Sequence, residues 1–235
     1  MSEEQERKRA VGSRVVVAVD GPSGSGKSST SRGVAARLGL RYLDTGAMFR
    51  AMTWWMLRHD VDVEDPEAVA AHVDVPRLAS GTDPRHPTIT VDGVDVAGPI
   101  RSSEVTAAVS AVSAVPAVRA RLLAEQRAII GVGGIVVEGR DIGTVVAPDA
   151  PVKVFLTAAA DTRAVRRTAE LTAGTDPAAT ERDLLRRDRL DSGRAQAPLA
   201  MAADAVHIDT TTHTLAEVVD TVTALVERAQ ERTGA

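Results

Sequence analysis

The feature that most limits the fold of this chain is a short apolar run that leads straight into a glycine-rich turn. Residues 14–19 read RVVVAV, which is typical of a strand buried on both faces of a sheet. Residues 21–28 follow as GPSGSGKS, and a helical pattern then continues until Gly39 ends it. Strand, turn and helix in this order fit G-x-x-x-x-G-K-[ST] in full, a pattern that predicts a phosphate-binding loop.

Each residue type in this loop has a physical reason. Glycines let the backbone curl until successive N–H groups point at a phosphate, and the next helix places its positive end at the same anion. Lys27 supplies a mobile charge for the β- and γ-phosphates, and the Ser28 hydroxyl can bind the Mg²⁺ that accompanies a nucleotide. The alternative, a turn that binds nothing, is disfavoured by the complete pattern. The residues expected to bind a triphosphate such as ATP are Gly21, Pro22, Ser23, Gly24, Ser25, Gly26, Lys27, Ser28 and Ser29.

Short apolar runs alternate with helical segments along the chain. This alternation predicts an α/β fold in three layers, with a five-stranded parallel sheet and right-handed crossovers. In such sheets ligands bind at the carboxyl ends of the strands, where the chemical motifs of this chain fall. The five predicted strands are residues 14–19, 41–43, 135–137, 152–156 and 206–209.

The region of residues 60–98 differs from its surroundings, because it carries nine acidic residues against two basic ones. The pair Asp92-Gly93 between two short alternating runs predicts a β-hairpin. We therefore expect a small β-rich insertion at residues 60–98, within a core formed by residues 14–59 and 99–235. Residues 1–13 are expected to form a disordered tail, and Pro116 should break a helix.

Composition excludes several classes of function. Aromatic residues make up only 2% of the chain, so a stacking platform for single-stranded nucleic acid is not expected. The net charge of −4 gives no basic field toward nucleic acid or anionic membranes, and no run approaches the length of a membrane span. The chain has no cysteine, which fits a reducing cytosol. We expect a cytoplasmic protein without nucleic-acid or membrane partners.

Two motifs point to an acceptor site. Thr45 is expected to cap the helix that follows the second strand, and Arg50, further along that helix, could hold an acceptor phosphate. An ordinary capped helix with an exposed arginine is an equally good interpretation. Residues 138–144, EGRDIGT, directly follow a predicted strand; there Arg140 offers planar donors for a phosphate, and Asp141 can accept from an amino group on a base. The alternative is a buried Arg140–Asp141 ion pair.

Residues 163–194 hold eight arginines against six acidic residues, in a chain that is acidic as a whole. A mobile arginine-bearing lid suits phosphoryl transfer, because pre-aimed cations stabilise the charge on the moving group once water is excluded. A solvated helix with i,i+4 ion pairs explains any single arginine but not the whole cluster. The arginines are Arg163, Arg166, Arg167, Arg182, Arg186, Arg187, Arg189 and Arg194.

Together these motifs make the chain similar to bacterial cytidylate kinases along nearly its whole length. The family resemblance rests on DGPSGSGKS (20–28), LDTGAMFR (43–50), IRSSEV (100–105), PAVR (116–119), EGRDIGTVVAPDA (138–150), RDRLDSGRAQAPL (187–199) and ADAVHIDT (203–210). It implies a P-loop kinase, usually monomeric, that uses ATP and Mg²⁺ to phosphorylate CMP or dCMP. It also implies that residues 60–98 enlarge a monophosphate-binding domain. Glu138 stands where the family often has Asp, and Thr45 where it often has Ser.

The resemblance also assigns roles to matching positions. Arg50, Arg140 and Arg194 would hold the CMP phosphate. Ser110, Arg119 and Asp141 would read the cytosine edge, whose N4 amino group and O2 and N3 acceptors suit this set. Arg187 and Asp191 would meet the sugar, and Thr45 completes the set. The residues expected to act in the chemical step are Lys27, Arg140, Arg187 and Arg194.

Two other functions stay open on the sequence alone. Another small P-loop kinase, acting on UMP, shikimate or gluconate, would share the phosphate loop. A nucleotide-dependent switch protein would also share it, with the acidic insertion as a partner surface. That second function predicts slow hydrolysis without an acceptor, and the arginine-rich segment disfavours it.

Lys27→Ala is expected to lose most of the phosphoryl-transfer turnover, because it removes a point charge from the β- and γ-phosphates. Turnover is measured as ADP release, and circular dichroism checks that the variant folds. Unaltered turnover in a folded variant would refute the role of Lys27 in the phosphate loop.

Overall fold

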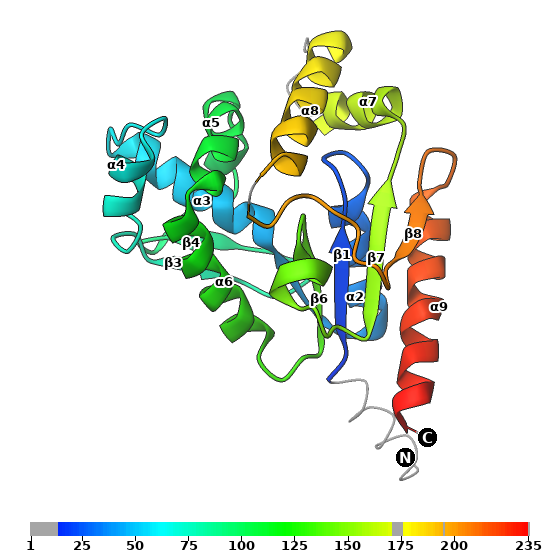
Figure 1. Cartoon of the computed structure of the whole chain (residues 1–235). Coiled ribbons are helices and arrows are strands. Elements are labelled where there is room, and N and C mark those ends of the chain that lie inside the picture. Colours follow the sequence, from blue (N-terminus) through cyan, green and yellow to red (C-terminus); the bar gives the residue numbers. More distant parts are fainter. Residues whose placement is uncertain (1–13, 171–175, 195, 235) are drawn as a thin grey trace. The chain divides into compact units, whose positions relative to one another are not determined.

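The computed structural model of the chain describes residues 14–170, 176–194 and 196–234 (Figure 1). The chain divides into a larger unit, residues 1–41 with 132–235, and a smaller unit, residues 42–131. The predicted tail at residues 1–13 lies outside the described residues.

The larger unit is built on a five-stranded sheet with strand order β2-β6-β1-β7-β8. β1 pairs in parallel with β6 and β7, and β7 pairs in parallel with β8. Val17 and Val19 of β1 are fully buried, as the β-branched run predicts. The prediction of an α/β fold with five parallel strands is confirmed. The strands are β1 (Val16–Asp20), β2 (Arg41–Asp44), where the chain passes into the smaller unit, β6 (Ile135–Gly139), β7 (Val152–Thr157) and β8 (Val206–Asp209).

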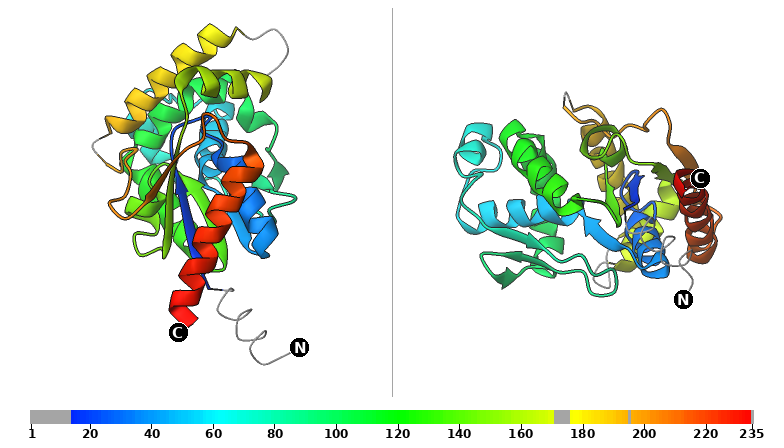
Figure 2. Two further views of the ribbon diagram at one scale, coloured as in Figure 1. Left: turned by 90° about the vertical axis from the view of Figure 1, so that its right-hand side faces the viewer. Right: turned by 90° about the horizontal axis from the view of Figure 1, so that it is seen from below.

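Helices of the larger unit follow its strands. α2 (Lys27–Leu38) ends at Gly39, whose positive φ of 66° lets its N–H bond to the carbonyl of Ala35. α9 (Leu215–Gly234) packs against α2 (Figure 2). α7 (Ala160–Glu170) and α8 (Pro177–Ser192) pack on each other and carry most of the arginine-rich segment. Residues 171–175 lie outside the described residues.

The smaller unit combines helices with a three-stranded antiparallel sheet in the order β3-β4-β5. Its core lies around α3, whose Met48, Met52 and Met56 are fully buried. The predicted insertion at residues 60–98 lies within this unit and includes a short helix, α4, that was not predicted. The elements are α3 (Thr45–Arg58), α4 (Pro66–Ala71), β3 (Leu78–Ser80), β4 (Ile89–Val91), β5 (Val94–Asp95), η1 (Pro99–Arg101), α5 (Ser103–Ala114) and α6 (Pro116–Ile130).

The cap of α3 differs from the prediction, which named Thr45. Asp44 caps this helix: its backbone is extended, and its Oδ1 accepts from the Ala47 N–H at 2.9 Å. An N-cap residue needs a non-helical backbone to turn its side chain onto the first turn. Thr45 is already the first helical residue, so the capping role falls one position earlier.

Pro116 separates two helices, as predicted. α5 ends at Ala114 and α6 begins with Pro116 in its first turn, where a missing N–H costs no helical hydrogen bond. Over the described part of the chain, no single helix is long and apolar enough to span a membrane. α5 and α6 reach that length and apolar composition only when taken together, and this pair is bent by 93°.

The predicted hairpin at Asp92-Gly93 is confirmed. Both residues have positive φ, 52° and 83°, which is the requirement of a type I′ turn between β4 and β5. The Asp92 carboxylate also accepts from the Arg77 N–H at 2.9 Å and from the Trp55 indole N–H at 3.2 Å. The turn is therefore tied to α3 as well as to its own strands.

Gly93→Ala is expected to lower the free energy of unfolding by about 1 kcal/mol, because an L-residue is strained at this positive φ. Gly98→Ala is the matched control: a Cβ at either glycine meets open space, but Gly98 has φ −76° and ψ −60°. That change should be neutral or slightly stabilising. Thermal unfolding of both variants measures the difference, and equal midpoints would contradict the argument.

Candidate active site

The glycine-rich loop has the curled backbone that its sequence predicts. Gly21, Gly24 and Gly26 have φ values of 145°, 78° and 86°. A Cβ at Gly21 would lie 2.1 Å from the carbonyl oxygen of Leu156 in β7. Only glycine fits there, so the loop can pass directly over the end of the neighbouring strand before it enters α2.

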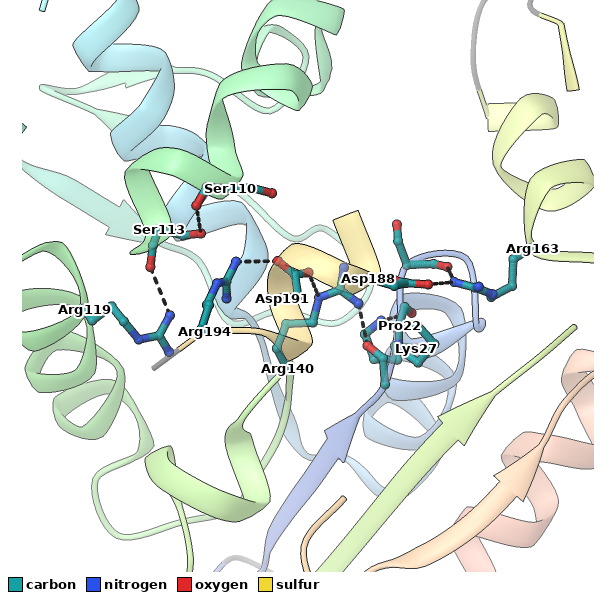
Figure 3. A network of polar contacts seen from close by, with 12 residues as sticks. Pro22, Lys27, Ser110, Ser113, Arg119, Arg140, Arg163, Asp188, Asp191 and Arg194 are labelled. Atoms are coloured by element: carbon teal, nitrogen blue, oxygen red, sulfur yellow. Dashed lines mark hydrogen bonds and ion pairs between the residues drawn. The ribbon is translucent and has the colours of Figure 1, made fainter. Parts of the chain in front are cut away.

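Lys27 and Ser28 carry the loop's polar chemistry. The Lys27 ammonium donates to the Pro22 carbonyl at 2.7 Å, which keeps it at the loop (Figure 3). The Ser28 hydroxyl donates to Oε2 of Glu138 at 3.0 Å. A hydroxyl beside a carboxylate that is only 3% exposed is a pair of hard oxygen ligands, and it fits Mg²⁺. Within the described ranges, no cluster of three or more His, Asp or Glu side chains could hold a metal, so the other ligands would come from phosphate and water.

Arg140 joins the phosphate loop to α8. Its guanidinium donates to the Gly21 carbonyl at 2.6 Å and pairs through Nε with Asp191 at 3.0 Å (Figure 3). Asp191 is 2% exposed and also pairs with Arg194. Two predicted site residues, Arg140 and Arg194, thus converge on one buried carboxylate, Asp191, which is itself a predicted site residue.

Arg187 lies among like charges. Burial lowers the pKa of its guanidinium to about 10, and Arg140 and Arg167 add to this effect, whereas Asp191 opposes it. Its Nε has no hydrogen-bond partner among the described residues. A buried cation beside other cations is the environment in which an added anion is stabilised most.

Other arginines of the segment 163–194 make different contacts. Arg163 donates to the Ser23 carbonyl at 3.1 Å and pairs with Asp188 at 2.6 Å, so it anchors α7 to the loop. Arg182 and Arg186 are exposed and make only long ion pairs, at 3.9 and 3.8 Å. The sequence cluster is therefore not one group of inward-facing cations.

Asp20 is a residue of this site that sequence reasoning missed. It ends β1, is nearly fully buried, and accepts from the N–H groups of Ile142 and Gly143 at 2.8 and 2.7 Å. It thereby holds the start of the π-helix η2 (Ile142–Val146), directly after Asp141. Burial raises the pKa of Asp20 to about 6, and the charge of Asp141 acts in the same direction. The sequence signal that could have indicated Asp20 is an acidic residue directly after the apolar run of residues 15–19.

Predicted site residues of the smaller unit are held by its own helices. Arg50 donates to the Ile100 carbonyl at 3.1 Å and to the Thr106 hydroxyl at 3.0 Å. Arg119 donates to the Ser113 carbonyl at 3.2 Å, and its guanidinium carbon lies 5.4 Å from the centre of the Phe49 ring.

Ser110 and Ser113 lie on α5 (Figure 3). The buried Ser110 hydroxyl has no partner among the described residues. The Ser113 hydroxyl donates to the Ser110 carbonyl at 3.2 Å. The smaller unit thus holds Arg119 through α5, and the Ser110 hydroxyl is buried on the same helix.

Comparison with known proteins gives consistent matches. Residues 17–228 match the family model described as cytidylate kinase. A cytidylate kinase of Streptomyces griseus is 59% identical over 217 residues, which cover 92% of this chain and 94% of that protein. One of Streptomyces coelicolor is 60% identical over 215 residues, or 91% of this chain and 93% of that protein.

One solved structure shares the fold. It is an uncharacterized protein from Eubacterium ventriosum, with a TM-score of 0.51 and 12% identity over 92% of this chain and 99% of that one. A likeness at this level of identity concerns the architecture alone, and it agrees with the α/β fold described above.

Asp20→Asn is expected to change how folding stability depends on pH. The folded-state pKa of Asp20 is raised from 3.8 to about 6, so between these values the folded protein binds more protons than the unfolded chain. Stability contributed by this group is therefore lost as the pH rises through that window. Denaturant unfolding from pH 4 to 7 should show this loss in the native protein and not in Asp20→Asn. Parallel curves would contradict the raised pKa.

Proposed function

Because the chain belongs to the cytidylate kinase family, we propose that it transfers the γ-phosphoryl group of ATP to CMP or dCMP, giving ADP and CDP or dCDP. The observation that carries this proposal is the match over residues 17–228, which includes the glycine-rich loop and the arginines around Asp191. The same residue set favours a kinase with a phosphate acceptor over a nucleotide-dependent switch.

ATP binds in the curled loop. The N–H groups of residues 23–28 and the positive end of α2 face its β- and γ-phosphates, and Lys27 moves from the Pro22 carbonyl onto them. Ser28 and Glu138, which are joined by a hydrogen bond at 3.0 Å, would hold Mg²⁺ together with the nucleotide. Bound there, the ion neutralises charge on the β- and γ-phosphate oxygens.

CMP is bound through its phosphate and its sugar. Arg50, Arg140 and Arg194 hold its phosphate, and Arg187 and Asp191 meet the sugar. Burial lowers the pKa of Arg187, which supports its second role of stabilising the charge on the transferred phosphoryl group, because a nearby anion would favour the charged guanidinium.

Cytosine is read by Ser110, Arg119 and Asp141. The buried hydroxyl of Ser110 supports this assignment, because it lacks a protein partner among the described residues. An acceptor at Asp141 suits the N4 amino group of cytosine and disfavours uracil, which has a carbonyl there. The first helical residue, Thr45, contributes to the same nucleotide site.

The reaction is an in-line displacement. An oxygen of the CMP phosphate, already anionic, attacks the γ-phosphorus, and the bond to the β,γ-bridging oxygen breaks as ADP leaves. No general base is needed, because the attacking oxygen carries no proton to remove. Lys27, Arg140, Arg187 and Arg194 stabilise the charge that spreads over the transferred group.

Two segments of the chain have supporting roles in the proposed enzyme. Residues 60–98 serve as the monophosphate-binding insertion, and residues 163–194 serve as a lid that excludes water when both nucleotides are bound. The enzyme acts in the cytoplasm, as a monomer, on small-molecule substrates. The net charge of −4 and the absence of cysteine support this setting.

A coupled assay of ADP release with CMP, dCMP, UMP and AMP tests the proposed reaction. CMP and dCMP should support turnover far above the rate without an acceptor. ATP hydrolysis that no nucleotide accelerates would contradict the proposed function and favour a switch protein.

Asp141→Ala tests base recognition. Losing a charged hydrogen bond costs roughly 1.5–3 kcal/mol, so KM for CMP should rise tenfold or more, whereas KM for ATP should change little. Asp149→Ala is the matched control, because Asp149 is an exposed aspartate in the same segment of the chain. Equal effects of Asp141→Ala on both substrates would remove Asp141 from base recognition.

A further inference from the structure

The carbonyl groups of the phosphate loop are held by side chains from elsewhere in the larger unit. Arg163 donates to the Ser23 carbonyl at 3.1 Å, and the Thr210 hydroxyl donates to the Ser25 carbonyl at 3.1 Å. Arg140 binds the Gly21 carbonyl at 2.6 Å. These donors decide how the peptide groups of the loop are turned.

The carbonyl and the N–H of one peptide group turn together, because the group is planar. In a trans peptide, the carbonyl and the following N–H point in opposite directions. Binding the Ser25 carbonyl from one side therefore turns the Gly26 N–H to the other side. Arg163 acts in the same way on the Gly24 N–H through Ser23. Donors aimed at one point are what an anion-binding loop requires.

Thr210 belongs to neither the loop nor the arginine-rich segment. It follows β8 directly and is only 3% exposed. Its N–H donates to the Thr157 carbonyl at 2.8 Å, and its hydroxyl lies 3.0 Å from the same oxygen. The residue is thus fastened to the end of β7 while its hydroxyl reaches the loop.

Arg166 connects Thr210 to α7. Its Nη1 donates to the Thr210 hydroxyl at 2.9 Å and its Nη2 to the Thr210 carbonyl at 2.7 Å. α7 also lies close against the loop at Gly24, where a Cβ would approach the Arg163 carbonyl oxygen to 2.9 Å. One buried hydroxyl therefore contacts β7, the phosphate loop and the first helix of the arginine-rich segment.

We propose that Thr210 is a positioning residue, which orients the Ser25–Gly26 peptide for phosphate binding and couples the phosphate loop to α7 through Arg166. It acts through Ser25 and does not itself contact the phosphates. The role in catalysis rests on the proposed function, but the effect on ATP binding does not require a particular acceptor.

Thr210→Val tests this role, because it keeps the shape of the side chain and removes the hydroxyl. Loss of one hydrogen bond should weaken Mg²⁺·ATP binding about threefold to tenfold. Thr210→Ser keeps the hydroxyl and should bind ATP like the native protein. Thr223→Val is the matched control, because Thr223 is 6% exposed and its hydroxyl has no partner among the described residues. That variant should leave ATP binding unchanged.

Two measurements separate positioning from general stability. The dissociation constant for Mg²⁺·ATP is measured by calorimetry without an acceptor, at a temperature where thermal unfolding shows every variant folded. KM for CMP should change less than KM for ATP in Thr210→Val. Equal ATP affinity of Thr210→Val and Thr223→Val would overturn the proposal, as would failure of Thr210→Ser to restore affinity.

Coupling to α7 has its own test. Arg166→Met alone should weaken ATP binding, and its effect should not add to that of Thr210→Val, because both act on one hydroxyl. Fully additive effects would overturn the coupling. This variant also keeps the proposal testable if Thr210→Val does not fold. A native protein that binds ATP but forms no CDP would contradict the proposed function and leave the positioning role intact.

Discussion

Parallel pairing of β1 with β6 and β7 is the constraint on which the candidate site depends. The register sets Asp20 beside Gly139 on one side and beside Phe155 on the other. Because parallel strands end at the same edge of a sheet, residues far apart in the chain meet there. Fully buried valines in β1 and β6 hold this register. Packing of the apolar core therefore also places the polar groups at the end of these strands.

Charge in the larger unit is arranged around two carboxylates of α8, of which Asp191 is buried and Asp188 is half-buried. Asp191 balances Arg140 and Arg194, and Asp188 balances Arg163. Burial lowers the pKa of Arg187, and the nearby charges of Arg140 and Arg167 lower it further. Burying cations without equal compensation costs stability. The same residue type therefore occurs in two environments, since Arg163 anchors α7 to the phosphate loop and Arg187 lies buried among other cations.

Most elements of the fold could be predicted from local patterns. The strand at residues 206–209 and the hairpin at Asp92-Gly93 match the structure, because apolar runs and turn residues act over a few neighbours. The helix α4 was missed, since six residues after an Asp65 cap give little periodicity to detect. The capping role given to Thr45 was wrong by one position, because it depends on the backbone angles of Asp44.

The sequence alone was enough to identify the phosphate loop, the positions of the five strands along the chain and the family. These are readable because a glycine's backbone freedom and a buried strand's branched side chains leave a fixed local pattern. Only the tertiary structure decided which arginines face inward, that Asp20 holds the turn after Asp141, and that Thr210 reaches the Ser25 carbonyl. Contacts between residues 185 positions apart are set by packing of the whole sheet, and no local pattern encodes them.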